Sequence, residues 1–446
     1  MGDTYEAIPS AKRLIKSLRD IGYDFSTAVA DLVDNSIEAG ASRVCINIGF
    51  YGNDSYVRIS DNGKGMSPEE LKEAMRYGSE REYQEEDLGK FGLGLKTASM
   101  SQCQRFSVAS KTKSNTPDIP VFCWDLSHIE KTDKWEVLKL TDRDTVELIT
   151  APLVETSGTV VLWERLDRII GFKQPEGDAA KKKLISMCRE LEAYLAMVFH
   201  KFLAKEVPGK ELELYFNDNP VQAWDPFARK EPATSTLSIV KIKLIHEGVQ
   251  CVLTIQPYIL PAKEEFSTPE AFERLSGPKK WNQQQGFYIY RANRMIQSGG
   301  WCGLRTQDEH TKLSRIELSF SPILDSAFKI NVAKMRVQLP TLVKDEIDRA
   351  IKSAVSLARD CYDKEKKKTP RPSMPYTPPE HAPINLVNNP RQFSVQKSPS
   401  SISSNSLPQM FTLEEIEKKA HEIATPIEKG VISNVFFRLR KRLSGE

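Results

Sequence analysis

Residues 31–41 read DLVDNSIEAGA, and this stretch decides the fold class together with two glycine-rich stretches that follow it. The hydrophobic spacing around it predicts a helix over 27–40, with Ser26 as its N-cap. Asp31 and Asn35 are four residues apart, so both side chains project from one face of that helix. A carboxylate beside a carboxamide can position a water molecule and a Mg²⁺ ion, which prefers oxygen ligands. A solvated polar helix face is the alternative explanation.

The first glycine-rich stretch is DNGKGM at 61–66, directly after the alternating strand pattern YVRIS. Gly63 and Gly65 permit a tight turn and a close approach of the backbone to a ligand. Asp61, at the end of the strand, can accept a hydrogen bond from an exocyclic amine such as that of adenine. An ordinary Asn-Gly turn without a ligand is the alternative.

The second glycine-rich stretch is LGKFGLGLKTASM at 88–100. Gly89, Gly92 and Gly94 precede a predicted helix start, and Lys96 lies beside them. Backbone N–H groups at the start of a helix form an anion site, to which a lysine adds positive charge. The spacing matches neither a Walker A loop nor a dinucleotide-binding Rossmann turn, so both of those phosphate sites are disfavoured.

The hydrophobic patterns along the chain mix helices with alternating strands and predict an α+β protein. The stretch GTVVLWE closes a first predicted domain over 1–170. A second predicted domain covers 178–365 and begins and ends with helical spacing. Residues 366–410 are rich in Pro and Ser and predict a disordered linker, because they cannot bury enough apolar surface to fold. Residues 411–446 predict a helical tail with a basic end.

Composition narrows the choice of function. The chain has 446 residues, of which 40% are hydrophobic, and a formal charge of +3. With so little net charge, any contact with nucleic acid requires a local basic patch. Apolar runs stay well below the roughly 20 residues of a membrane-spanning helix, so no membrane partner is expected. The seven cysteines are scattered without a CxxC pair, which favours reduced thiols in a cytoplasmic protein over a zinc or disulfide framework.

The order and spacing of the three stretches resemble the GHKL ATPases (gyrase, heat-shock chaperone, histidine kinase and MutL). DLVDNS with EAGA looks like their N-box, DNGKGM like their G1 box, and GKFGLGLKTASMS like their G2 box or ATP lid. The stretch SGTVVLWE resembles the Gly-Thr strand beside their adenine pocket. The likeness is greatest to the bacterial MORC and MutL-like branch. It implies a Bergerat-fold α/β sandwich over about 1–170, with helices on one face of a mixed sheet and the nucleotide between.

The resemblance also implies a role for each motif residue, with ATP and Mg²⁺ as the bound groups. Asn35 is expected to ligate Mg²⁺. Asp61 is expected to accept from the adenine amine, with help from the Thr159 hydroxyl. Gly63 and Gly65 are expected to form the turn beside the base, and Met66 is expected to line the base pocket. The residues expected to hold the β- and γ-phosphates are Gly89, Gly92, Gly94 and Lys96.

The general base departs from the pattern of the family. Gyrase-, chaperone- and MutL-type members carry a Glu four residues before the magnesium Asn, where this chain has Asp31. An Asp is one methylene shorter, so it holds the attacking water less far into the pocket. Slow hydrolysis with Asp31 as base or water-positioning residue is expected. ATP binding without hydrolysis is the alternative.

The second predicted domain resembles the transducer domain of MutL and MORC proteins, which has a ribosomal S5-like fold. The likeness lies in FYIYRANRMIQSGGW at 287–301 and in FKINVAKMRVQLP at 328–340. Transducer domains of this kind return one Lys to the γ-phosphate, and Lys334 is the candidate here. Arg336 is a weaker candidate, and a surface lysine on a loop is the alternative for Lys334.

These features lead to the hypothesis of an ATP-gated homodimer that clamps or remodels double-stranded DNA, with operon-encoded partner proteins in a bacterial defence system. Two alternatives stay open: a heat-shock-type chaperone ATPase, and a nucleotide-gated scaffold for operon partners. A sensor kinase is disfavoured, because such proteins carry a phospho-accepting His before the ATPase motifs and no His precedes His128.

Overall fold

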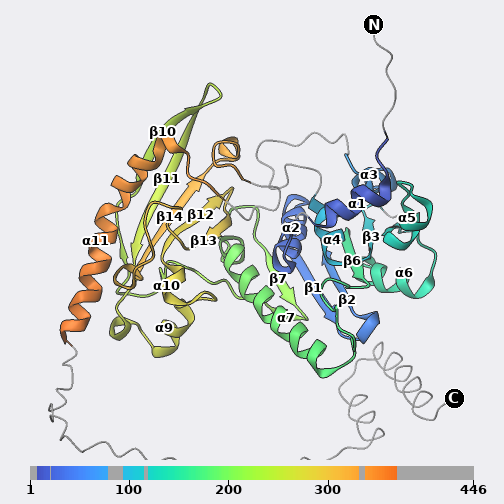
Figure 1. The fold of residues 1–446 in the computed structure, drawn as a ribbon, viewed down its shortest axis with the longest axis horizontal. Helices are drawn as coiled ribbons and strands as arrows, with labels where there is room; N and C mark the ends of the chain where they lie inside the picture. Colours follow the sequence, from blue (N-terminus) through green and yellow to red (C-terminus); the bar gives the residue numbers. More distant parts are fainter. Residues whose placement is uncertain (1–7, 21, 79–93, 115–118, 331–336, 369–446) are drawn as a thin grey trace, which may run out of the picture. The chain divides into compact units, whose positions relative to one another are not determined.

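The structure is a computed structural model that describes residues 8–20, 22–78, 94–114, 119–330 and 337–368. These residues form two β-sheets with their helices (Figure 1). The first sheet has the strand order β5-β4-β3-β6-β2-β1-β7-β8. The second has the order β10-β11-β14-β12-β13, with β9 paired to β11. Helices pack on both sheets, so the predicted α+β class is confirmed.

The first sheet, its helices and the turns between them contain the described residues of the predicted N-box, G1 box, G2 box and Gly-Thr strand. Its strands are β1 (Arg43–Gly49), β2 (Tyr56–Asp61), β3 (Arg105–Lys111), β4 (Val121–Asp125), β5 (Leu138–Lys139), β6 (Gly158–Glu164), β7 (Glu213–Phe216) and β8 (Asn219–Pro220). The helices of this part are α1 (Ala11–Arg19), α2 (Phe25–Glu38), α3 (Pro68–Met75), α4 (Gly94–Gln102), α5 (Leu126–Thr132), α6 (Arg143–Thr150), α7 (Asp178–Val198) and α8 (His200–Leu203), with short 3₁₀ turns at Gly52–Asp54 and Ala151–Leu153.

Helix α2 carries the predicted N-box. The N-cap predicted at Ser26 is wrong, because the helix begins two residues earlier. The side chain of Asp24 accepts a hydrogen bond from the Thr27 N–H at 2.7 Å, which satisfies one of the free donors in the first turn. Asp and Ser are equally good N-cap residues, so residue type does not distinguish Asp24 from Ser26. Phe25 is buried in the core as the first residue of the helix, and this favours Asp24 as the N-cap.

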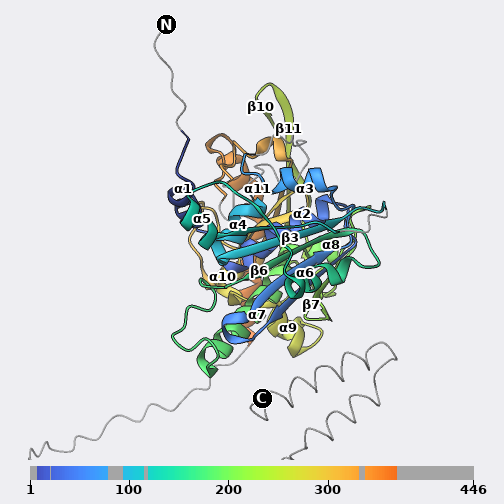
Figure 2. The same cartoon turned by 90° about the vertical axis from the view of Figure 1, so that its right-hand side faces the viewer.

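Strand β6 shows why both faces of the first sheet are covered. Val161 and Trp163 point into the large core that the sheet shares with α1, α2, α4 and α7. Val160 and Leu162 point the other way, into a small cluster with Ile149 of α6. The expectation of helices on one face therefore needs a correction, because α6 lies on the face opposite α4 (Figure 2).

The first sheet extends beyond residue 170, where the first predicted domain ends. After α7, strand β7 returns and pairs parallel with β1, so that Val44 lies opposite Leu214 and Ile46 opposite Phe216. Helix α7 itself packs into the first core through Leu184, Leu191 and other apolar residues. Residues 178–220 thus complete the first sheet, and the predicted segment 178–365 contributes to both sheets.

The second sheet is antiparallel except for one pair, β12 beside β14. Its strands are β9 (Ser235–Thr236), β10 (Val240–His246), β11 (Val249–Ile259), β12 (Gly286–Arg291), β13 (Arg294–Ser298) and β14 (Ser314–Phe320). Its helices are α9 (Pro269–Leu275), α10 (Lys280–Gln284) and α11 (Lys344–Lys368), with 3₁₀ turns at Lys263–Glu265, Glu309–Thr311, Pro322–Leu324 and Thr341–Val343. Helix α11 buries Ile347, Ile351 and Ala354 in the core of this sheet.

The predicted linker from 369 onward and the predicted tail at 411–446 lie outside the described residues. Within the described ranges, no helix has the length and apolar character needed to cross a membrane. All seven cysteines are free thiols.

His200 joins α8, which packs with the first sheet, to the second sheet. Its ring is fully buried, and its Nε2 lies 2.7 Å from the hydroxyl of Tyr290 on β12. Burial lowers the pKa of His200 to about 3, because a charged imidazolium would lose its hydration there. The ring is therefore neutral in the folded protein at every pH above that value.

We expect this histidine to make the fold sensitive to acid. Between pH 6.5 and 3 the unfolded chain protonates His200 and the folded chain does not, so the free energy of unfolding falls as the pH falls, by up to about 1.4 kcal/mol per pH unit. His200→Gln removes this proton, and its urea-unfolding stability should depend less steeply on pH than that of the wild type. His246→Gln, at the end of β10, is the matched control. Parallel curves for the wild type and His200→Gln would contradict the assignment.

Candidate functional site

Asp61, the last residue of β2, is the centre of the site. Its Oδ1 accepts hydrogen bonds from the backbone N–H of Gly63 at 2.9 Å and from that of Thr159 at 3.2 Å. Its Oδ2 accepts from the hydroxyl of Ser36 on α2 at 3.0 Å. One carboxylate thus holds together α2, the end of β2 and the start of β6.

Asp61 is a partly buried acceptor whose pKa is subject to opposing effects. Burial raises the pKa of Asp61 above its ordinary value, while the hydrogen bonds from Gly63, Ser36 and Thr159 act in the opposite direction. Each oxygen of a carboxylate can accept two hydrogen bonds. Oδ2 accepts one from Ser36 and keeps room for an amine donor of a ligand.

Two glycines of the predicted motifs are required by the backbone around Asp61. Gly65 has φ +67°, and a Cβ there would overlap the carbonyl oxygen of Lys111. Gly158 has φ +148°, and a Cβ there would overlap the carbonyl oxygen of Asp61 itself. A Cβ at Gly63 would come within 2.9 Å of Ala39 at the end of α2. The glycines therefore let β2, β6 and the turn after β2 approach one another closely.

Met66 and Thr159 are joined through a residue that the sequence reasoning missed. The Ser110 hydroxyl on β3 accepts a hydrogen bond from the Met66 N–H at 2.9 Å. The same hydroxyl lies 2.9 Å from the hydroxyl of Thr159. Ser110 also donates to the carbonyl oxygen of Gly158 at 3.0 Å. The G1 turn and the Gly-Thr strand are thereby connected across β3, and no local pattern around Ser110 indicates this.

Asp31 and Asn35 lie on α2 in different environments. Asp31 is only 3% exposed, and its Oδ2 accepts a hydrogen bond from the Tyr23 hydroxyl at 2.7 Å. Burial and the charge of Asp31 together raise the pKa of Tyr23, so the phenol stays protonated as donor. Asn35 is partly buried, and no hydrogen bond joins its side chain to the other described residues. Its carboxamide oxygen is therefore available to a ligand.

The start of α4 lies against Asp31, whereas Lys96 points elsewhere. A Cβ at Gly94 would come within 3.7 Å of Asp31 Oδ2. The buried ammonium of Lys96 donates to the carbonyl oxygen of Ala74 on α3 at 2.9 Å. Burial lowers the pKa of Lys96 to about 8, and the charge of Glu73 acts in the opposite direction. Its predicted phosphate contact stays a prediction.

Some predicted site residues lie outside the described residues, namely Gly89, Gly92, Lys334 and its weaker substitute Arg336. Their expected contacts with the phosphates stay predictions. The other nine predicted site residues are described, namely Asp31, Asn35, Asp61, Gly63, Gly65, Met66, Gly94, Lys96 and Thr159.

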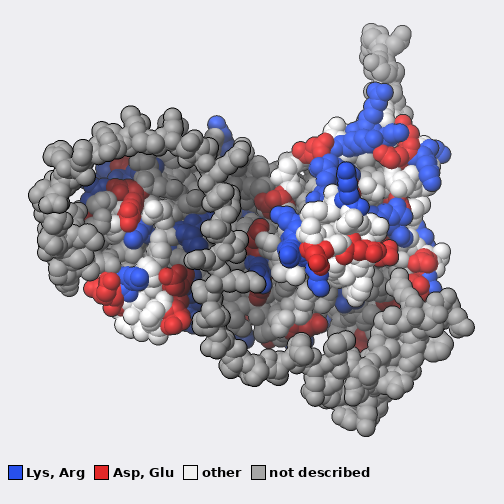
Figure 3. Space-filling model, turned by 60° about the horizontal axis from the view of Figure 1, so that its bottom comes forward, with Lys and Arg blue, Asp and Glu red and all other residues white. Residues whose placement is uncertain are grey.

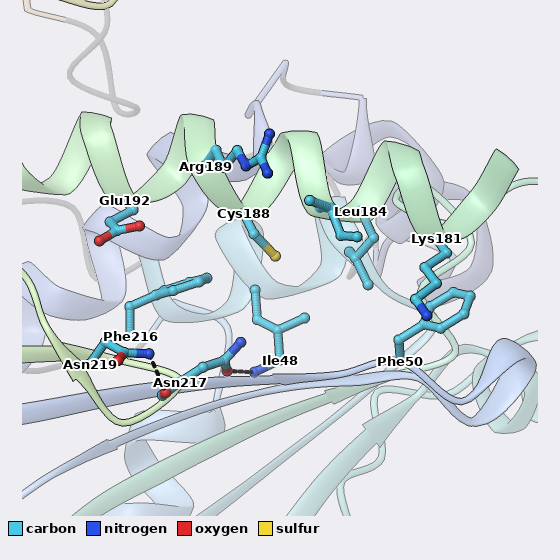
Figure 4. A pocket seen from close by; sticks show the side chains of 11 residues that line it. Ile48, Phe50, Lys181, Leu184, Cys188, Arg189, Glu192, Phe216, Asn217 and Asn219 are labelled. Atoms are coloured by element: carbon cyan, nitrogen blue, oxygen red, sulfur yellow. Dashed lines mark hydrogen bonds between the residues drawn. The ribbon is translucent and has the colours of Figure 1, made fainter. Parts of the chain in front are cut away.

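A cavity of about 400 Å³ lies under α7 in the described part of the chain and shares no residue with the predicted site (Figure 4). Its floor is formed by Ile48, Phe50 and Phe216 of the first sheet. The oxygen of the Asn217 side chain at its edge already accepts from the Ile48 N–H at 2.8 Å.

The site fits a nucleotide with a divalent ion. Asp61, Ser36 and Thr159 present the acceptor and hydroxyl groups that would hold a base, and Asn35 offers one oxygen ligand on the same helix as Ser36. The described residues contain no cluster of three His, Cys, Asp or Glu that could hold a metal by itself. Mg²⁺ commonly takes one or two protein oxygens and completes its shell with phosphate and water.

The comparison with known proteins agrees with this geometry. The family described as histidine kinase-, DNA gyrase B- and HSP90-like ATPase matches residues 23–159. The DNA mismatch repair protein MutL of Shewanella denitrificans is 38% identical over 96 residues, which are 20% of this chain and 14% of that protein. MutL of Paramagnetospirillum magneticum is 33% identical over 103 residues, 23% and 16% of the two chains. PMS1 of Arabidopsis thaliana is 49% identical over 49 residues, 11% and 5% of the two chains.

The aligned segment thus spans about one seventh of the length of the curated MutL relatives. The family match begins at Tyr23, the donor to Asp31, and ends at Thr159, the donor to Asp61. It therefore covers α2, the turn after β2, α4 and the start of β6, which are the elements that meet at Asp61. Residues 23–159 of the chain are therefore assigned to the GHKL superfamily, with a local similarity to MutL.

Proposed function

We propose that this chain binds ATP with Mg²⁺ and hydrolyses it slowly. The observation that carries the proposal is the Asp61 carboxylate, which receives hydrogen bonds from Ser36, Gly63 and Thr159 inside the segment that matches the ATPase family. Three elements converge there on one acceptor with spare capacity. Such a partly buried, oriented acceptor suits the amine of a purine base.

At the base end, Asp61 accepts from the adenine amine through Oδ2, and the Thr159 hydroxyl makes a further contact with the ring. Ser110 orients that hydroxyl from 2.9 Å away. Met66 lines the base pocket beside the turn that Gly63 and Gly65 form. The protein's part at this end is binding and orientation only.

At the phosphate end, Asn35 ligates the Mg²⁺ ion, which neutralises charge on the phosphates when bound. Asp31 positions the attacking water and accepts its proton, with Tyr23 holding the carboxylate in place. Gly89, Gly92 and Gly94 direct backbone N–H groups at the phosphates, and Lys96 and Lys334 add positive charge. For this role the Lys96 ammonium has to give up its hydrogen bond to the carbonyl oxygen of Ala74. Burial lowers the pKa of Lys96, so the charge is poorly stabilised in its present position.

We extend the proposal to an ATP-gated homodimer that acts on double-stranded DNA, in the manner of MORC- and MutL-like proteins, in a bacterial defence system. Its supports are the relatives named as DNA mismatch repair proteins and the resemblance of the second part to a transducer domain. On the face shown in Figure 3, Lys and Arg side chains lie interspersed with Asp and Glu. Because the formal charge of the chain is only +3, we propose that DNA is enclosed by a closed dimer, which needs no strong overall positive charge.

Asn35→Ala should abolish Mg²⁺-dependent ATP hydrolysis, with a fall in kcat of about 100-fold or more, because the ion loses its protein ligand. A phosphate-release assay with excess Mg²⁺ measures this. The matched control is Asn53→Ala in the exposed turn after β1, which should hydrolyse ATP like the wild type. Wild-type turnover in Asn35→Ala would refute the assignment of the metal ligand.

Asp61→Asn should weaken ATP binding by about 10- to 100-fold, the effect of one hydrogen bond to a charged group. The Asn oxygen can still accept from Gly63 and Thr159, whereas its NH₂ group would face the adenine amine donor to donor. Isothermal calorimetry with a non-hydrolysable ATP analogue measures the change in Kd. Asp54→Asn, exposed in the same turn as Asn53, is the control. Unchanged affinity in a folded Asp61→Asn protein would place the base elsewhere.

The homodimer clamp can be tested by sizing the protein with a non-hydrolysable ATP analogue, with and without DNA. We expect a dimer only with nucleotide, and retention at high salt on circular but not on linear DNA, because a closed ring can slide off a free end. A monomer under all conditions would overturn the clamp and leave the ATPase proposal to the two tests above.

A further inference from the structure

Arg294, the first residue of β13 in the second sheet, reaches the N-box helix of the first. Its guanidinium is fully buried, and its Nε lies 3.2 Å from Oδ1 and 3.1 Å from Oδ2 of Asp34. Asp34 is also fully buried and lies between Asp31 and Asn35 on α2. One buried ion pair therefore joins the two sheets beside the residues that we assign to water and Mg²⁺.

The pair is part of a short series of contacts that ends at α4. Burial works against the charge of Arg294, but the charges of Asp34 and Asp31 hold its pKa above the ordinary value, so the guanidinium is charged. Asp31 in turn accepts from the Tyr23 hydroxyl at 2.7 Å. The same hydroxyl has a side-chain hydrogen bond with Thr97 on α4.

Arg294 is not fully satisfied by these contacts. Its Nη1 donates to the carbonyl oxygen of Met295 at 3.2 Å, while its buried Nη2 has no hydrogen-bond partner. Buried donors without partners are uncommon in folded proteins. The guanidinium therefore has one donor that these contacts do not use.

We propose that Arg294 is a positioning residue for ATP hydrolysis: it holds Asp34, and through α2 and Tyr23 it fixes Asp31 relative to the start of α4. The second sheet then acts on the rate of hydrolysis through this contact as well as through the predicted Lys334. This inference rests on the proposed ATPase function. Arg294 itself touches neither water nor nucleotide.

The test compares two buried arginines of the same sheet. Arg294→Lys keeps a positive charge but loses the planar group that contacts both oxygens of Asp34. Arg315→Lys is the matched control, because Arg315 is equally buried but donates to the carbonyl oxygens of Pro226 and Leu275, away from α2. We expect Arg294→Lys to lower kcat at least 10-fold with the Kd for ATP changed less than threefold. Arg315→Lys should leave kcat within about twofold.

A second readout does not depend on hydrolysis. Amide hydrogen exchange of α2 and α4 should become faster in Arg294→Lys and stay unchanged in Arg315→Lys. Wild-type kcat in Arg294→Lys, or equal losses in both variants, would overturn the inference. A wild type without Mg²⁺-dependent hydrolysis would overturn the proposed function and with it the positioning role of Arg294 in hydrolysis. Unchanged hydrogen exchange of α4 in Arg294→Lys would overturn the series of contacts from Arg294 to α4.

Discussion

Helix α2 is buried on almost every side, and this constraint governs the arrangement of the rest of the site. Phe25, Val29, Val33 and Ile37 fill the first core, as an ordinary internal helix would. Asp31 and Asp34 of α2 are buried too, and a carboxylate taken out of water costs several kcal/mol unless it is paired or hydrogen-bonded. Each acid therefore needs a partner from another element. The partners then determine where the helix lies.

The two partners come from opposite directions along the chain. Tyr23, just before α2, donates to Asp31, and Arg294 of the second sheet pairs with Asp34. Breaking a buried ion pair by removing one partner typically costs about 3–5 kcal/mol, because the other charge stays in the interior. The neutral His200, bonded to Tyr290, makes a second buried link to the same sheet. These two buried polar contacts stabilise the packing of the second sheet against the first.

The sequence singled out several residues that the structure brings together at Asp61. Gly63, Gly65 and the Gly-Thr strand were recognised from residue type and order, and the structure brings them to Asp61 because β2 pairs with β6, with Ser60 opposite Val160. The mixed α+β class also followed from alternation and helical spacing. These features depend on residues that are close in the chain or on backbone conformations that only glycine adopts.

The remaining features depend on contacts that no local pattern encodes. Ser110 and Ser36 are ordinary serines in the sequence, and each acquires its role from a strand or turn many residues away. Arg294 lies in a stretch that reads as a strand and turn, and nothing near it indicates Asp34. Strand β7 is short, and its parallel pairing with β1 is a tertiary event. The roles of the predicted site residues in catalysis remain predictions.

The late return of β7 has a consequence for how the protein is made. Strands β1, β2, β3 and β6 are synthesised before α7, yet β1 has no partner on its outer side until β7 follows. Until then the growing chain has an open strand edge and an apolar face that α7 later covers, both of which favour aggregation. The first sheet is therefore complete only after a segment that is made well after its own motifs.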